Sequence, residues 1–244
     1  MKKINESENQ LMQALSNAFG KDKLFSRNFK DRFNEDFFNK CYNIFNKYFF
    51  FSKLDKIPIF YKSDNYIRNF LIDRKANKND IPDLFFGTHT ILYDNDPKTL
   101  KMTDTLIIHD DIILLNMDHI ENKSLVFAIA CLCHEMIHYY DRLFGEYCTF
   151  TKFSIINNIR INTHNTPTFE DMKDKANELG INVIQEIPRN KNSKILDREA
   201  IELLFTKLQN GDMISEEENH FMVDNPNTIV TKFDDNAGGC IITF

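Results

Sequence analysis

A chain of 244 residues, with 42% hydrophobic residues and a formal net charge of −6, can bury a full core as one domain with additions or as two small domains. Its five cysteines are odd in number and scattered, which argues against a disulfide framework and favours a reducing compartment. The polar N-terminal stretch has no secretory signal, and no apolar run approaches the ~20 residues that cross a membrane, so we expect a cytoplasmic protein without a membrane partner.

Residues 1–78 form a basic, phenylalanine-rich region. They hold 16 Lys or Arg and 9 Asp or Glu, whereas residues 79–244 hold 14 and 27. Phenylalanines recur at every fourth position from Phe25 to Phe37, and the aromatic stripe continues to Phe49. This period predicts one or two amphipathic helices with an aromatic and a basic face. Such a surface can stack on single-stranded nucleic acid, but phenylalanines at helical spacing more often form a core or a docking surface, which we favour.

Strands are predicted after a polar linker that ends at Pro82. Three apolar runs follow, at residues 85–93, 103–109 and 112–115. The first two read as strands around a polar turn at 94–97, and an exposed strand of this kind can pair with an extended peptide backbone. Between the last two runs lie Asp110 and Asp111, where a turn or a cap for the next element is favoured over a metal site. His89, which has no histidine partner at ligand spacing, is predicted to be an ordinary strand residue.

The most specific pattern of the chain is His134-Glu135-Met136-Ile137-His138. It lies on a predicted helix that begins after Ser124, is apolar on every side before the motif, and ends at Gly145. Histidines four residues apart project from one face of a helix, so both can reach one Zn²⁺ at ~2.0–2.1 Å. Glu135 stands beside the metal without having to bind it, where it can take a proton from an activated water.

A catalytic zinc site needs a third protein ligand. The extended pattern H-E-x-x-H-x-x-G-x-x-H is not present, because Asp141 replaces its glycine and Phe144 its last histidine. The best candidate is His164, on a loop just before a predicted helix that has Asn165 or Thr166 as its cap and Pro167 in its first turn. Three downstream glutamates remain as alternatives: Glu146, Glu170 and Glu178.

These segments together resemble the SprT-like (Spartan-type) zinc metalloprotease family over residues 85–187. Members carry H-E-M/L-x-H, then a histidine in an H-G-x-x-F segment, then a helix that ends near a glycine, then a strand. The corresponding parts here are His134 to His138, His164 with Phe169, residues 172–180 and residues 181–184. The chain departs from the pattern in lacking the glycine after His164 and in having one extra residue before Phe169. The resemblance implies an α+β, zincin-like domain with a small antiparallel or mixed sheet beside the motif helix, and His134, His138 and His164 as zinc ligands.

We therefore predict three parts: a helical region at 1–78, a SprT-like metalloprotease core at 79–188, and residues 189–244 with a helix and an acidic, then apolar tail. The predicted function is that of a zinc-dependent endopeptidase acting on a protein or peptide substrate. The metal would lower the pKa of a water from ~15.7 towards ~7, and Glu135 would accept its proton and pass it to the leaving amine. Asp141 is expected to bond a ligand imidazole. The oxyanion is expected to be stabilised by one of three tyrosines: Tyr139, Tyr140 or Tyr147.

Two other functions stay open. In the first, the zinc fold is a non-catalytic scaffold, and the N-terminal helices and the apolar tail fasten it into a larger assembly such as a virus particle. In the second, which is weaker, the chain is a DNA-associated protease. DNA contact would then fall to residues 1–78, because the predicted core is acidic and no downstream Cys-x-x-Cys pair is present.

Overall fold

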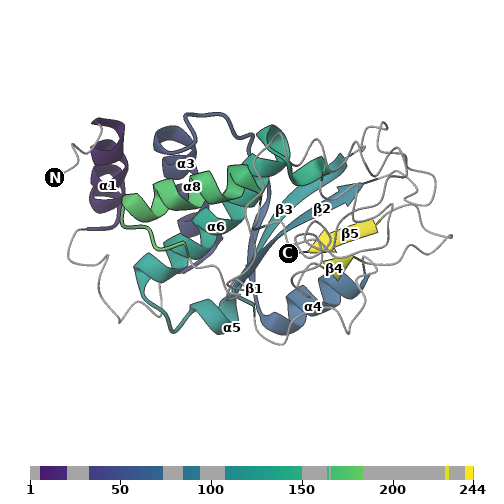
Figure 1. Ribbon diagram of the computed structural model, residues 1–244. Helices are drawn as coiled ribbons and strands as arrows, with labels where there is room; N and C mark the ends of the chain where they lie inside the picture. Colours follow the sequence, from purple (N-terminus) through teal and green to yellow (C-terminus); the bar gives the residue numbers. More distant parts are fainter. Residues whose placement is uncertain are drawn as a thin grey trace, which may run out of the picture.

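The computed structural model describes residues 6–20, 33–73, 85–93, 108–149, 164, 166–183, 229–230 and 240–243. Over these ranges the protein is a mixed α+β fold, with helices packed on a small mixed sheet (Figure 1). The α+β class is thus the predicted one. No helix within these ranges has both the length and the apolar character that crossing a bilayer requires.

The sheet is organised around β3 (Ile108–Asn116) and has the strand order β1-β3-β2-β5-β4. β1 (Ile59–Lys62) lies parallel to β3, and β2 (Gly87–Tyr93) lies antiparallel to it on the other side. β5 (Cys240–Thr243) then pairs with β2, and β4 (Ile229–Val230) pairs with β5, both antiparallel. β1 comes from the N-terminal region, where only helices were expected, and it therefore joins that region to the predicted metalloprotease core.

Helices cover both faces of the sheet (Figure 1). α6 (Leu125–Phe144) and α3 (Glu35–Tyr48) pack on one face, with α1 (Glu6–Phe19) against α3 and α8 (Pro167–Glu178) against α6. α4 (Asp64–Asp73) packs on the other face, and α5 (Met117–Ile120) follows β3 directly. Successive residues of a strand point to opposite faces, so β3 feeds both cores through the pairs Ile113 with Leu115 and Ile112 with Leu114.

The aromatic residues of the N-terminal region form core in the part that the structure describes. α3 begins after Asn34, whose side chain accepts a hydrogen bond from the backbone N–H of Phe37 at 2.8 Å, so the helix does not extend back to Phe33. Four aromatic side chains of α3 are buried: Phe37, Phe38, Tyr42 and Phe45. For these residues the interpretation as core rather than as a nucleic-acid surface is confirmed.

Some predicted features fall outside the described residues. These are Phe25 and Phe29, the turn at 94–97, the strand residues 103–107 and the helix expected between residues 194 and 209. They stay predictions.

The prediction of a turn or cap at Asp110 and Asp111 is wrong, because β3 runs through both residues as one strand. Asp111 is buried, with its Oδ1 3.0 Å from His89 Nε2 on β2, and its Oδ2 accepts a hydrogen bond from Arg142 on α6. A carboxylate can be buried in a sheet when it is paired and hydrogen-bonded in this way. The acidic residue that suggested a turn, Asp111, is instead part of a buried ionic network that joins β2, β3 and α6.

Replacing Asp111 by alanine should lower the free energy of unfolding by about 3 kcal/mol, because Arg142 then stays largely buried without its counter-charge. The neighbouring Asp110 is exposed, so Asp110→Ala is a matched control that should change stability by less than about 0.5 kcal/mol. Urea denaturation followed by circular dichroism measures both variants. Equal losses would show that the ionic network does not stabilise the strand.

Candidate metal centre

The helix that carries the motif has the predicted boundaries. Ser124 caps α6 by accepting a hydrogen bond from the N–H of Phe127 at 3.2 Å, and Gly145 follows the last turn. His138 is fully buried, and His134 and Glu135 expose 9% and 5% of their surface. Two imidazoles and a carboxylate thus lie buried on a helix whose first nine residues are apolar, where polar groups are costly unless something binds them.

His164 reaches the same place from the segment before α8. The cap of α8 is Thr166, one of the two predicted candidates, whose Oγ1 accepts a hydrogen bond from the N–H of Phe169 at 3.1 Å. The same hydroxyl donates to Asp141 Oδ2 on α6 at 2.5 Å. This bond ties the start of α8 to α6 and so fixes the segment that positions His164.

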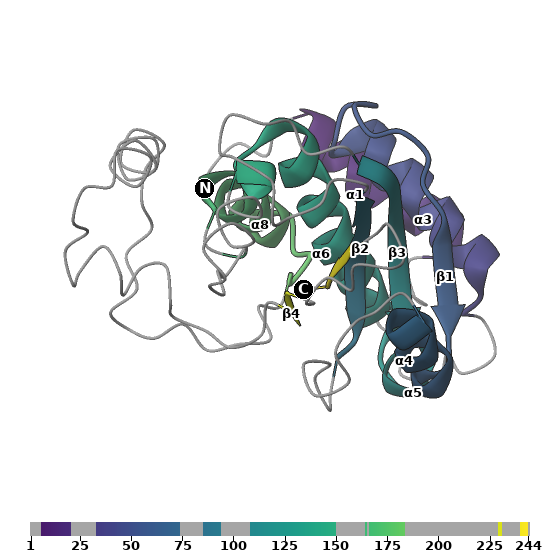
Figure 2. The same ribbon diagram turned by 90° about the vertical axis from the view of Figure 1, so that its right-hand side faces the viewer.

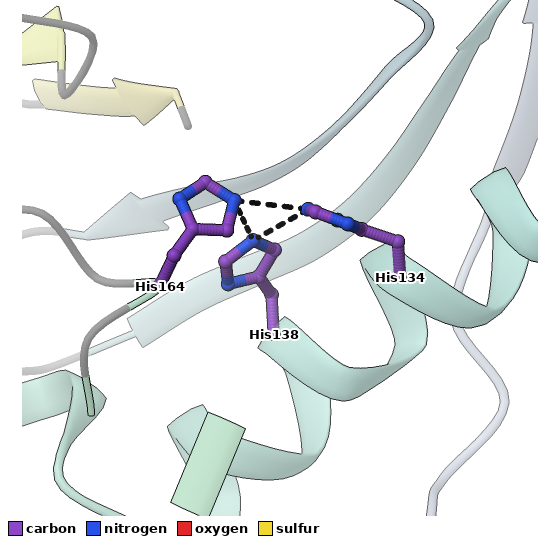
Figure 3. Close-up of side chains that lie close together, drawn as sticks. All are labelled: His134, His138 and His164. Carbon is purple, nitrogen blue, oxygen red and sulfur yellow. Dashed lines mark hydrogen bonds between the residues drawn. The ribbon is translucent and has the colours of Figure 1, made fainter. Parts of the chain in front are cut away.

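The three imidazole rings meet through their Nε2 atoms (Figure 3). The distance between His134 and His164 is 3.0 Å, and each of the other two Nε2 pairs is 3.1 Å apart. Among the residues that the structure describes, this is the one group whose ligand atoms gather closely enough to hold a metal ion. The structure thus brings together the three histidines that the sequence nominated.

Hydrogen bonds alone do not account for this triangle. A neutral imidazole Nε2 carries either one N–H or one lone pair, so it cannot donate and accept at once. Three mutual hydrogen bonds would require every corner to do both. A cation between the rings, in contrast, binds all three lone pairs. The ligand nitrogens of a tetrahedral Zn²⁺ at ~2.0–2.1 Å lie about 3.3–3.4 Å apart, so a small outward movement of the rings makes these residues fit the ion.

Phe169 forms one wall of the cluster. Its ring stacks on His138 with centroids 4.5 Å apart and contacts the rings of His164 and His134 at 5.0 and 5.3 Å. Burial, together with the neighbouring histidines, holds the pKa of His138 and of His164 well below the usual range. Both rings are therefore neutral at physiological pH, which is the form that binds metals.

Glu135 lies against the backbone of β2. A Cβ atom built on Gly87 would stand 2.9 Å from Glu135 Oε1 and 3.0 Å from the Leu115 side chain. Any side chain at position 87 would displace the carboxylate, so the strand and the motif helix fix its position together. The contact of Gly87 with Glu135 was not predicted from the sequence. A glycine inside a predicted strand is the signal that could have indicated a close approach.

The role predicted for Asp141 differs from its observed one. Its carboxyl accepts hydrogen bonds from the Thr166 hydroxyl, from the N–H of Glu146 at 2.9 Å and from the N–H of Tyr147. None of these bonds in the described residues runs to a ligand imidazole. It organises the turn after α6 and the start of α8. Burial raises the pKa of Asp141 to about 7, although the Thr166 bond opposes the shift.

The alternative third ligands that were considered have other contacts. Glu146 accepts a hydrogen bond from the N–H of Thr168 at 3.3 Å, and Glu170 forms an ion pair with Lys173. Glu178 is in α8 and, like the other two glutamates, is outside the group of gathered ligand atoms.

The three candidate tyrosines differ in their surroundings. Tyr140 packs on Phe50 and Phe144, and Tyr139 lies beside Arg142. The ring of Tyr147 lies 6.3 Å from that of His138, between the cluster and His89. Of the three, Tyr147 is the residue with a ring contact to a clustered histidine.

The strand expected at 181–184 is absent in its described part, because residues 181–183 have no regular structure. Gly180 has a φ of +80° and turns the chain back, and the Val183 N–H donates to Asn177 Oδ1 on α8 at 2.8 Å. This segment therefore closes α8 instead of joining the sheet.

Comparisons of the chain with protein-family models, with curated proteins and with solved structures find no match.

The raised pKa of Asp141 predicts that the free energy of unfolding falls as the pH rises. A carboxyl whose folded pKa of about 7 exceeds its unfolded value of 3.8 stabilises the protein fully at low pH, and that contribution is lost as pH rises through about 7. Asp141→Asn keeps an acceptor for Glu146 and can donate to Thr166, but it does not titrate. Between about pH 5 and pH 8 the wild type should therefore lose roughly 2 kcal/mol relative to the variant. Urea titrations of both in EDTA measure this difference, and parallel pH curves would contradict it.

Proposed function

We propose that this protein is a zinc-dependent endopeptidase with a zincin-like, SprT-type active site. The observation that carries the proposal is the convergence of three imidazole Nε2 atoms, 3.0–3.1 Å apart, beside a buried glutamate on the same helix. The His134, His138 and His164 side chains fit the ligand set of Zn²⁺ because they offer three imidazole nitrogens, from α6 and from the segment before α8, which packs on α6.

The number of ligands favours catalysis over a scaffold. Structural zinc sites are usually closed by four protein ligands, whereas catalytic sites keep three and leave one position to water or substrate. Within the described ranges the cluster has three members. Glu135 is a further indication, because a purely structural site has no use for a buried carboxylate next to its first ligand.

The protein's own residues have distinct roles in this proposal. A bound zinc supplies Lewis acidity, which polarises a carbonyl and makes water acidic. Glu135 accepts the proton of the attacking water and delivers it to the leaving amine. Gly87 lets the carboxylate reach its position, and Phe169 keeps one side of the histidines dry. Of the three candidate tyrosines, Tyr147 has a ring contact with a clustered histidine, and it packs beside the His138 imidazole.

Metal content tests the ligand set. Purified wild type should hold about one Zn²⁺ per chain by elemental analysis, and His164→Ala should weaken its affinity by at least ~100-fold, because two imidazoles remain. His119→Ala is the matched control. His119 is also partly buried, but it lies near Asp64, with Nε2 3.8 Å from Oδ1, and should leave the metal content unchanged. A wild type without bound metal, or His164→Ala with unchanged affinity, would contradict the assignment.

Cleavage of an unfolded protein such as reduced casein tests the chemistry. Glu135→Gln should retain zinc and lose at least ~1000-fold in activity, because the amide cannot accept the proton. Gly87→Ala should also retain zinc but lose activity in part, because its methyl group displaces Glu135. A zinc-loaded wild type that cuts nothing would contradict the endopeptidase function and leave the scaffold function instead.

A further inference from the structure

One edge of β2 is occupied by a strand from the far end of the sequence (Figure 2). β2 pairs along its whole length with β3, and on its other edge Ile91, Leu92 and Tyr93 stand opposite Ile242, Ile241 and Cys240. The residues before this contact are enclosed as well. Thr88, His89, Thr90 and Ile91 each expose 1% of their surface or less. In this conformation β2 is therefore an interior strand.

The same strand adjoins the candidate metal centre. Gly87 lies against the Glu135 carboxylate, and His89, two residues further on, has its ring 6.1 Å from that of Tyr147. Alternate residues of a strand share a face, so Gly87, His89 and Ile91 belong to the face of β2 that is turned to α6. A peptide backbone paired with β2 would thus pass beside the residues assigned to the chemistry.

β5 runs toward this site. Because β5 is antiparallel to β2, its residues from Cys240 to Ile242 pass in turn opposite Tyr93, Leu92 and Ile91. A strand continuing in this register would pass opposite His89 and then Gly87, which touches Glu135. The sequence of β5, Cys-Ile-Ile-Thr, is uncharged, as expected of a segment that adds to a sheet next to a dry site.

We infer that β5 acts as an intramolecular competitor, because within the same chain it occupies the edge of β2 at which an extended peptide strand can pair. The inference rests on the proposed function only for the cleavage that would follow peptide binding. The ligand pairs with β2 by main-chain hydrogen bonds in the register that β5 shows. β5 must leave before a substrate strand can pair, so the described conformation is the closed state of the enzyme.

Competition within one chain is effective even when its contacts are few. A tethered segment acts at an effective concentration in the millimolar range, whereas a free peptide competes at its actual concentration. Three paired residues can therefore hold the edge against dilute peptides. A substrate that offers a longer strand, reaching from Tyr93 to Gly87, gains more hydrogen bonds than β5 and can displace it.

A disulfide can lock β5 in place. Cys240 is already present opposite Tyr93, and facing residues of antiparallel strands lie within the Cα separation that a disulfide spans. In the full-length Tyr93→Cys variant, oxidation should link the introduced thiol to Cys240, which mass spectrometry after proteolysis detects. Failure of this bond to form would contradict the register and overturn the inference. The wild type treated in the same way controls for the other cysteines, and phosphine reduction reverses the lock.

Two proline variants have the opposite effect and open the site. Ile241→Pro and Ile242→Pro each remove a backbone N–H and weaken β5 pairing. The probe is a fluorescent peptide with the sequence of residues 239–244 in which serine replaces cysteine. By anisotropy, the proline variants should bind it about tenfold more tightly than the wild type, and the oxidised Tyr93→Cys variant should not bind it until it is reduced. Equal binding by the locked, open and wild-type proteins would overturn the inference.

These experiments distinguish a failure of the β5 inference from a failure of the proposed endopeptidase function. If the open variants bind the probe but cut no casein, although elemental analysis finds zinc, the peptide site stands and the endopeptidase function fails. If all variants cut casein at one rate, locked or not, the endopeptidase function stands and β5 is not a competitor.

Discussion

The bond between the Thr166 hydroxyl and the Asp141 carboxyl is the contact on which the candidate metal centre depends. It joins the helix that carries His134 and His138 to the segment that supplies His164. Gly145 lies in the same junction, where an added Cβ would clash with the Asp141 carboxyl and stand 2.6 Å from Thr168. The junction is therefore packed without spare room. His164 is distant in sequence from the motif, and its position is set by the Thr166 cap of α8 and the Asp141 carboxyl instead of by strand pairing.

Burial defines the chemistry of this region in two ways. It keeps His138 and His164 neutral, so their nitrogens are donors to a metal, and it raises the pKa of Asp141 towards neutrality. Asp111 is in a different situation, because Arg142 and His89 lie against its two oxygens. The two aspartates thus have different roles. Asp111 forms an ion pair with Arg142 of α6, and Asp141 of α6 accepts hydrogen bonds from neutral groups.

The parts of the fold that could be predicted from the sequence are those that local chemistry determines. Ser124, Gly145 and Thr166 mark helix ends through contacts within a few residues, and the spacing of His134 and His138 is a property of one helix. The missed features depend on partners far along the chain. The parallel β1–β3 pair joins residues more than fifty positions apart, and Asp111 is tolerated in a strand because Arg142 comes from another element. The position of Gly87 over Glu135 is of the same kind.

The arrangement of β1 also bears on the order of events during synthesis. β1, β2 and β3 all precede α6 in the sequence, and the third histidine follows it. Because a chain is synthesised from its N-terminus, the residues of β1, β2 and β3 are made before those of the motif helix. The first two histidines follow with α6, and His164 is made after them. β5 is made after all of them, so synthesis includes an interval in which all three histidines are present and the β2 edge has no β5 to pair with.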